Sequence, residues 1–129
     1  MHFAYTIVYV ADVRAAVAFY ERAFGFAPRF VSEDGDYGEL ETGSTTLSFA
    51  SAGMAEVNGT PLELPDPARP APGIEIAFAT GDVAAAWEQA LAAGATAVVE
   101  PAQKPWGQVV AYVRDPFGVL VEICTPMAG

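Results

Sequence analysis

The chain has 129 residues, of which 53% are hydrophobic and 17% charged, so its length suits one domain, or two small halves, with a packed core. Asp and Glu number 16 against 6 Lys and Arg, and a net charge of −10 disfavours binding to nucleic acid or anionic membranes. No apolar run reaches the length of a membrane span, no signal peptide is recognisable, and the lone Cys124 excludes an intrachain disulfide. We therefore expect a cytoplasmic protein.

The first half of the chain predicts a strand, a helix and three more strands. Residues 3–10 are rich in aromatic and β-branched side chains, which are typical of a strand. Asp12 is suited to cap a helix that ends at Gly25, because apolar side chains recur between them at helical spacing. Turn residues then divide three further strand candidates, around 26–32, 37–42 and 45–50.

The middle of the chain interrupts this pattern, and the second half repeats it. Residues 52–73 contain five of the ten prolines and little periodicity, which predicts an extended linker. A strand at 74–80, a helix from Asp82 to Gly94 and three strands follow, at 96–100, 107–114 and 118–124. We expect a first module at 1–51 and a second module at 74–129.

An internal repeat connects the two halves. Tyr5 to Asp12 has the same spacing as Glu75 to Asp82, and Tyr37-Gly38 matches Trp106-Gly107. The repeat predicts an α+β fold of two βαβββ modules. These would form a curved mixed sheet, with a concave trough on one side and the helices outside.

Several motifs resemble one family. Val10-Ala11-Asp12-Val13, Phe19-Tyr20, Phe24-Gly25-Phe26 and the stretch Asp115-Pro116-Phe117-Gly118-Val119-Leu120-Val121-Glu122 are similar to those of the vicinal-oxygen-chelate superfamily. That superfamily includes glyoxalase I, extradiol dioxygenases, fosfomycin-resistance enzymes and bleomycin-resistance proteins. The resemblance covers the chain outside the linker and implies the fold above, but the fold hosts unrelated chemistries.

The resemblance also implies four positions for ligands of a divalent metal. Glu122 matches the family, Glu75 stands in place of the usual His, and Tyr5 and Ser48 replace two more ligands, with Phe49 as the alternative to Ser48 if the register differs by one. Catalytic Zn, Ni, Fe or Mn normally has at least three firm protein ligands. We therefore expect no complete metal site; if a metal does bind, Glu75, Glu122 and Tyr5 would hold it. The only histidine, His2, lies near the terminus, three residues from the expected position.

Strand alternation places both carboxylates in the trough. Ile76 and Val121 would face the helices, which leaves Glu75 and Glu122 on the opposite side of the sheet. Three interpretations stay open: a general acid or base, a pair that binds a cationic or polyhydroxyl ligand, or a structural role in which Glu75 contacts Tyr5 or Arg114.

Aromatic residues supply the remaining candidates. Trp106, Tyr37 and Tyr112 could line a pocket, or could simply pack in the core. Cys124 has no neighbouring His in the sequence and is expected to be an inert, buried thiol.

Two functions follow from the resemblance. The first is a bleomycin-resistance-like protein that binds a small molecule between Tyr5, Glu75, Tyr112 and Glu122, with Trp106 at the rim, and needs no catalytic metal. The alternative is a divalent-metal-dependent lyase, isomerase or dioxygenase. In either case we expect a homodimer, because unpaired sheet edges favour association.

Overall fold

The computed structural model describes residues 1–127, and within them the chain forms an α+β fold of eight strands and three helices. The chain divides into two compact units. Unit 1 spans Met1–Leu64 and unit 2 begins at Pro65, so the division falls inside the stretch expected to be a linker.

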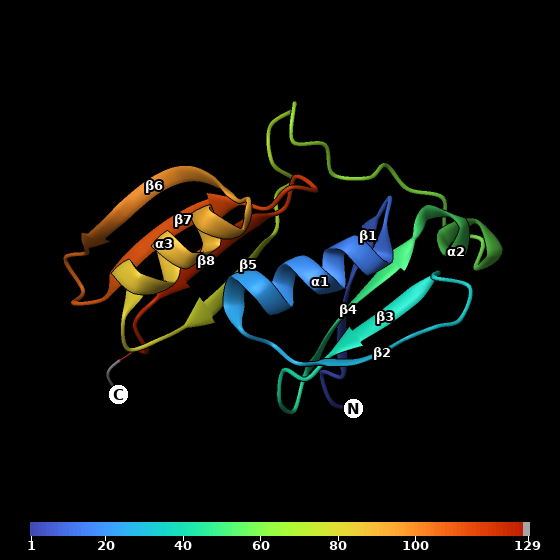
Figure 1. Ribbon diagram of the computed structural model, residues 1–129, viewed down its shortest axis with the longest axis horizontal. Helices are drawn as coiled ribbons and strands as arrows, with labels where there is room; N and C mark the ends of the chain where they lie inside the picture. Colours follow the sequence, from blue (N-terminus) through green and yellow to red (C-terminus); the bar gives the residue numbers. More distant parts are fainter. Residues whose placement is uncertain (128–129) are drawn as a thin grey trace. The chain divides into compact units, whose positions relative to one another are not determined.

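Unit 1 contains a four-stranded mixed sheet with one helix covering one face (Figure 1). The strand order is β1-β4-β3-β2; β1 and β4 are parallel, and the other neighbours are antiparallel. The elements are β1 (Tyr5–Val10), α1 (Val13–Phe24), β2 (Pro28–Val31), β3 (Tyr37–Leu40), β4 (Thr46–Ser51) and α2 (Ala52–Val57).

Unit 2 repeats this topology with the order β5-β8-β7-β6, in which β5 and β8 are parallel (Figure 1). The elements are β5 (Glu75–Ala79), α3 (Val83–Ala93), β6 (Thr96–Gln103), β7 (Val109–Arg114) and β8 (Leu120–Cys124). The two predicted βαβββ modules are therefore confirmed.

Local sequence explains where the first helix begins and ends. The Asp12 side chain accepts a hydrogen bond from Ala15 N at 3.0 Å, which satisfies one of the free amides of the first turn. Gly25 ends the helix with φ of 80°, a left-handed conformation that glycine adopts without steric cost. Asp82 and Gly94 occupy the same positions around α3.

The helix of unit 1 packs closely on its sheet. The rings of Tyr20 and Phe49 lie 5.0 Å apart, and a Cβ added to Gly38 would come within 3.0–3.2 Å of Val17 and Val13. Leu40 and Phe49 are fully buried on this side. We call this the helix face of the sheet and the other side the distal face.

Strand alternation and pairing register identify the distal-face residues. In unit 1 they include Tyr5, Ile7, Tyr37, Glu39, Thr46 and Ser48. In unit 2 they include Glu75, Ala77, Tyr112, Arg114, Leu120, Glu122 and Cys124, while Val113, Val121 and Ile123 are buried on the helix face.

The structure corrects three sequence-based expectations. Helix α2 lies within the stretch expected to be an extended linker, and the Ser51 hydroxyl caps it. Strand β6 runs to Gln103, beyond the predicted end at 100. The match of Tyr37-Gly38 with Trp106-Gly107 is wrong. Tyr37 pairs with Ala50 in unit 1, and the residue at the equivalent position of unit 2 is Val110, which pairs with Cys124.

No helix within residues 1–127 has the length and apolar character needed to cross a bilayer.

Candidate functional site

Three polar side chains meet on the distal face of unit 2. Glu75 comes from β5, Glu122 from β8 and Tyr112 from β7. Tyr112 is directly opposite Glu122 in the antiparallel register, and its hydroxyl donates to Glu122 Oε1 at 2.8 Å. The Glu75 carboxyl group lies close enough to Glu122 to interact with it electrostatically. Glu122 therefore occupies the centre of the group.

The acidic groups around Glu122 all hold their protons more tightly than usual. Burial, followed by the contact with Glu122, raises the pKa of Glu75. The hydrogen bond to Glu122 raises the pKa of Tyr112 to about 12. Burial and then Glu122 raise the pKa of the Cys124 thiol, which disfavours the reactive thiolate. Glu122 thus contributes to a raised pKa in each of these three groups.

The hydrogen bonds of Arg114 disfavour a structural charge pair between Glu75 and Arg114. This guanidinium donates to two backbone carbonyls, Gly118 O at 3.0 Å through Nε and Asp66 O at 3.0 Å through Nη2. Arg114 therefore connects the β7–β8 turn to Asp66 at the start of unit 2, and within residues 1–127 it forms no ion pair with Glu75.

Unit 1 carries different residues at the equivalent positions. Tyr5 is the first residue of the β1–β4 pairing, as Glu75 is of the β5–β8 pairing, so these two residues are equivalent. Two residues further along the second strand of each pair, Ser48 is equivalent to Glu122. Phe49, the alternative for the fourth ligand position, is excluded because its ring packs against α1 on the helix face. Ser48 is fully buried, and its Oγ has no hydrogen-bond partner among residues 1–127.

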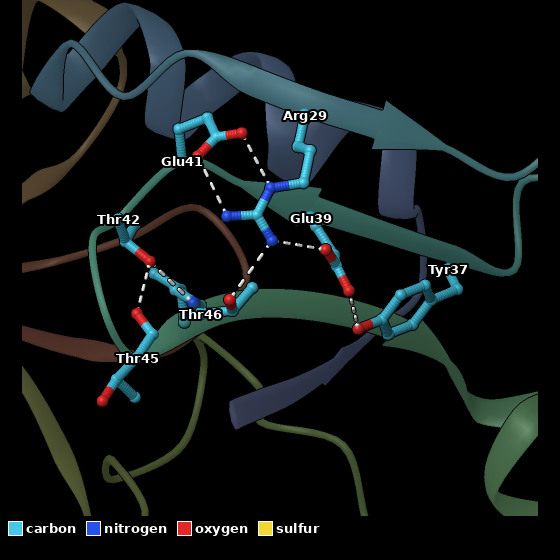
Figure 2. A network of polar contacts seen from close by, with 8 residues as sticks. Arg29, Tyr37, Glu39, Glu41, Thr42, Thr45 and Thr46 are labelled. Atoms are coloured by element: carbon cyan, nitrogen blue, oxygen red, sulfur yellow. Dashed lines mark hydrogen bonds and ion pairs between the residues drawn. The ribbon is translucent and has the colours of Figure 1, made fainter. Parts of the chain in front are cut away.

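A charged network lies beside Ser48 on the distal face of unit 1 (Figure 2). Glu39 accepts from Arg29 Nη1 at 2.8 Å through Oε1 and from the Tyr37 hydroxyl at 2.7 Å through Oε2. Arg29 also donates from Nε and Nη2 to both oxygens of Glu41, at 2.8 and 2.9 Å. These bonds lower the pKa of Glu41 and raise that of Arg29.

Only Tyr37 of this network is among the candidate residues that the sequence predicts. Glu39 and Glu41 are two residues apart near a strand, a spacing that could have indicated carboxylates on one face. Nothing in the sequence indicated Arg29, because a register irregularity between Pro28 and Phe30 makes it an extra residue in β2.

The remaining predicted residues fall in different places. Trp106 is 63% exposed in the turn before β7, and its Nε1 donates to Gln108 Oε1 at 2.8 Å. Tyr5 and Tyr37 belong to unit 1, whereas Trp106 and Tyr112 belong to unit 2. A trough that joins these residues therefore stays a prediction.

The donor sets do not fit a catalytic transition-metal centre. No group of three or more His, Cys, Asp or Glu side chains able to hold a metal comes together anywhere in residues 1–127. Unit 2 offers two carboxyl groups, and the equivalent positions of unit 1 offer a phenol and a buried hydroxyl. Such a centre normally has three firm protein ligands and an open position.

Solved structures share the fold over nearly the whole chain. A glyoxalase-related enzyme from Fulvimarina pelagi is 24% identical with a TM-score of 0.82, covering 98% of this chain and 88% of that chain. A glyoxalase/bleomycin resistance protein/dioxygenase family enzyme from Burkholderia phytofirmans PsJN is 21% identical with a TM-score of 0.80, covering 97% and 98%. A glyoxalase/bleomycin resistance protein/dioxygenase from Nocardioides is 20% identical with a TM-score of 0.76, covering 100% and 85%.

Comparison of the sequence with curated proteins and with family models gave different results. No curated protein matches the chain significantly. The family model described as Glyoxalase/Bleomycin resistance protein/Dioxygenase superfamily matches residues 2–123, nearly the entire chain. Together with the two βαβββ units, this match shows that the chain belongs to the glyoxalase/bleomycin resistance protein/dioxygenase superfamily.

Proposed function

We propose that this protein binds a small cationic or hydroxylated molecule on the distal face of unit 2 and does so without a catalytic metal. The observation that carries the proposal is the Glu122 carboxyl group, which accepts a hydrogen bond from the Tyr112 hydroxyl at 2.8 Å and lies on the same face as Glu75. Family membership alone leaves the function open, because this fold supports unrelated chemistries.

The chemistry around Glu122 suits a ligand that donates hydrogen bonds. A carboxylate has about four lone-pair sites, so Glu122 can accept further bonds besides that of Tyr112. The chain's net charge of −10 attracts cations and repels anions. The aromatic ring of Tyr112 adds apolar contact area beside the charge, as is usual in small-molecule sites.

Substitution of Glu122 by Gln tests the proposal. Glu122→Gln is expected to weaken a cationic ligand by about 1–3 kcal/mol, because a charge-assisted hydrogen bond is lost, and to change the melting temperature little. Isothermal titration with metal-free bleomycin, a cationic compound with aromatic rings, measures the effect. Glu88→Gln, which removes the same charge from an exposed position on α3, is the matched control.

Two outcomes would contradict the proposal. If Glu122→Gln and Glu88→Gln bind the probe equally well, Glu122 does not contact the ligand. If Glu122→Gln strongly destabilises the fold, Glu122 is a structural hydrogen-bonding group.

A metal-dependent lyase, isomerase or dioxygenase is the second candidate. It is favoured by Glu75 and Glu122, which occupy two of the superfamily's metal-ligand positions and lie together on one face. Metal content separates the two proposals. We expect protein purified without chelator or a nickel-binding tag to contain well under one Zn, Ni, Fe or Mn per chain. About one metal per chain that is lost in Glu122→Ala and kept in Glu88→Ala would favour the enzyme.

A further inference from the structure

The chain contains one Asn-Gly pair, which lies at the end of α2. Asn58 is the only asparagine in the sequence and directly follows Val57, the last residue of the helix. Its side chain is exposed and makes no hydrogen bond within residues 1–127. Gly59 is exposed with φ of 76°, and no atom lies within 4 Å of the position of an added Cβ. No neighbouring side chain therefore shields the Asn58 amide group or the Gly59 backbone from solvent.

An exposed Asn-Gly pair can lose ammonia without any enzyme. Gly59 N, after losing its proton to water, forms a bond to Asn58 Cγ, and the bond from Cγ to Nδ2 breaks to release ammonia. A glycine permits this approach because it has no Cβ. Water then opens the five-membered imide at one of its two carbonyl carbons. One opening leaves aspartate at position 58, and the other leaves isoaspartate, in which the main chain runs through the former side chain.

The end of α2 has to open before this ring can close. Gly59 N donates to Glu56 O at 3.0 Å, and this hydrogen bond keeps the nitrogen from attacking Asn58. The helix has only six residues, and no basic residue stabilises the carbonyls of its last turn. Short helix ends open at little cost in free energy. The fold therefore delays the reaction only slightly.

The only Asp-Gly pair of the chain, Asp34-Gly35, is held in place by its surroundings. Aspartate forms the same imide from its protonated carboxyl group. Asp34 Oδ1 accepts from Ser32 Oγ at 2.7 Å and from Asp36 N at 3.0 Å, and these bonds lower the pKa of Asp34. Arg14 Nε lies 3.4 Å from the position of a Cβ on Gly35. The structure thus disfavours the reaction at Asp34 and leaves Asn58 open to it.

We propose that Asn58-Gly59 is a site of spontaneous deamidation, which adds a negative charge at the end of α2 and loosens this end. The proposal does not depend on the function proposed above, because Asn58 lies outside both sheets. The new carboxylate is unfavourable beside the negative end of the helix. In the isoaspartate form, one extra main-chain methylene displaces Gly59 N from Glu56 O and Thr60 N from Ala55 O, which are bonded at 3.0 and 2.8 Å.

Incubation of the full chain at physiological temperature and mildly alkaline pH, followed by peptide mass spectrometry, measures the reaction. The peptide that contains Asn58 is expected to exchange NH₂ for OH, and an isoaspartyl methyltransferase should label the isoaspartate product. The rate should lie within about tenfold of that in the same chain unfolded in urea, because a helix end opens at little cost. Protection of Asn58 by more than about tenfold in the folded chain would overturn the proposal.

Two glycine variants and the Asp-Gly pair supply the controls. Gly59→Ala is expected to slow the reaction at least about tenfold, because a Cβ hinders attack by the backbone nitrogen. Gly73→Ala, at another exposed glycine with no atom near an added Cβ, should react like the wild type. Isoaspartate that accumulates at Asp34 rather than at Asn58 in the folded chain would overturn the proposal, and so would a Gly59→Ala protein that reacts as fast as the wild type.

The deamidated chain tests the loosening of α2. Anion-exchange chromatography separates it from the unmodified chain by its additional negative charge. Amide hydrogen exchange at Gly59 and Thr60 is expected to be faster in the deamidated chain, whereas exchange in β4 should stay unchanged. Equal exchange at the end of α2 in both forms would overturn the structural part of the proposal.

Discussion

At the scale of single residues, equivalent positions in the two units carry different chemistry. Glu122 of unit 2 corresponds to Ser48 of unit 1, and Tyr112 corresponds to Glu39. Each distal face thus has one central carboxylate that accepts from a tyrosine hydroxyl, but the carboxylate comes from β8 in unit 2 and from β3 in unit 1. Both units therefore contain a hydrogen-bonded tyrosine–carboxylate pair, but its residues lie on non-equivalent strands.

The raised pKa of Glu75 predicts how stability depends on pH. The pKa of Glu75 is higher in the folded than in the unfolded protein. The resulting contribution to the free energy of unfolding is fully present below the ordinary pKa of 4.5 and is lost as the pH rises through the raised pKa of the folded protein. Glu75→Gln cannot ionise, so its stability should fall less than that of the wild type over this range. Melting temperatures measured between about pH 4 and pH 8 test the difference.

Glu88→Gln serves as the control for this measurement. It is exposed on α3 and should show the pH dependence of the wild type. Equal slopes for Glu75→Gln and the wild type would show that burial and Glu122 do not hold the proton on Glu75.

At the scale of elements, the turn between β7 and β8 explains the Asp115-Pro116-Phe117-Gly118 motif. Asp115 is buried, and its Oδ1 accepts from Phe117 N at 2.9 Å and Val119 N at 2.8 Å. Gly118 has φ of 100°, and a Cβ there would lie 2.8 Å from backbone atoms of Asp66. The turn therefore packs against the backbone of Asp66, at the beginning of unit 2, more closely than a residue with a Cβ atom would allow.

Gly118→Ala is expected to lower the free energy of unfolding more than Gly107→Ala does. Gly107 has nearly the same φ, 101°, but no atom within 4 Å of an added Cβ. Gly107→Ala should therefore show the conformational cost alone, about 1–2 kcal/mol. Gly118→Ala should lose about 1–3 kcal/mol more, because the backbone of Asp66 has to shift.

Urea unfolding of the two glycine variants measures this difference. Equal losses would show that the segment around Asp66 moves away without cost, and that the packing of the turn against it contributes nothing to stability.

At the scale of the whole molecule, the sheets present edges that favour self-association. In unit 1, β1 and β2 each have one neighbour in their sheet, and β5 and β6 are the corresponding edges of unit 2. Phe3, Tyr5 and Ile7 are exposed at or beside the β1 edge, with Phe3 70% exposed. Unpaired edges and apolar side chains together favour a second copy of the chain.

We expect a homodimer with twice the chain mass of 13.5 kDa. Light scattering coupled to gel filtration at micromolar concentration measures this mass. Replacement of Ile7 by Lys, on the β1 edge, should shift the equilibrium toward monomer, whereas Val57→Lys, at an exposed position of α2, should not. A mass near 13.5 kDa for the wild type would contradict the expectation.

The sequence by itself determined the order of the eight strands and the two main helices, and the faces of β5 and β8. Asp12, Gly25, Asp82 and Gly94 bound the two main helices as predicted, because capping depends on a few neighbouring residues. Alternation also placed Glu75 and Glu122 on the face away from α3, since the side-chain period of two is a local property of a strand.

Only the tertiary structure decided which side chains meet. Arg29 reaches Glu39 and Glu41 because β2 contains an extra residue, and Ser48 lies opposite Glu39 because β3 and β4 pair in one register. The match of Tyr37 with Trp106 failed for the same reason, since equal spacing along the chain does not specify pairing. Register is set by contacts between distant segments, and a shift of one residue would turn every side chain of a strand to the other face.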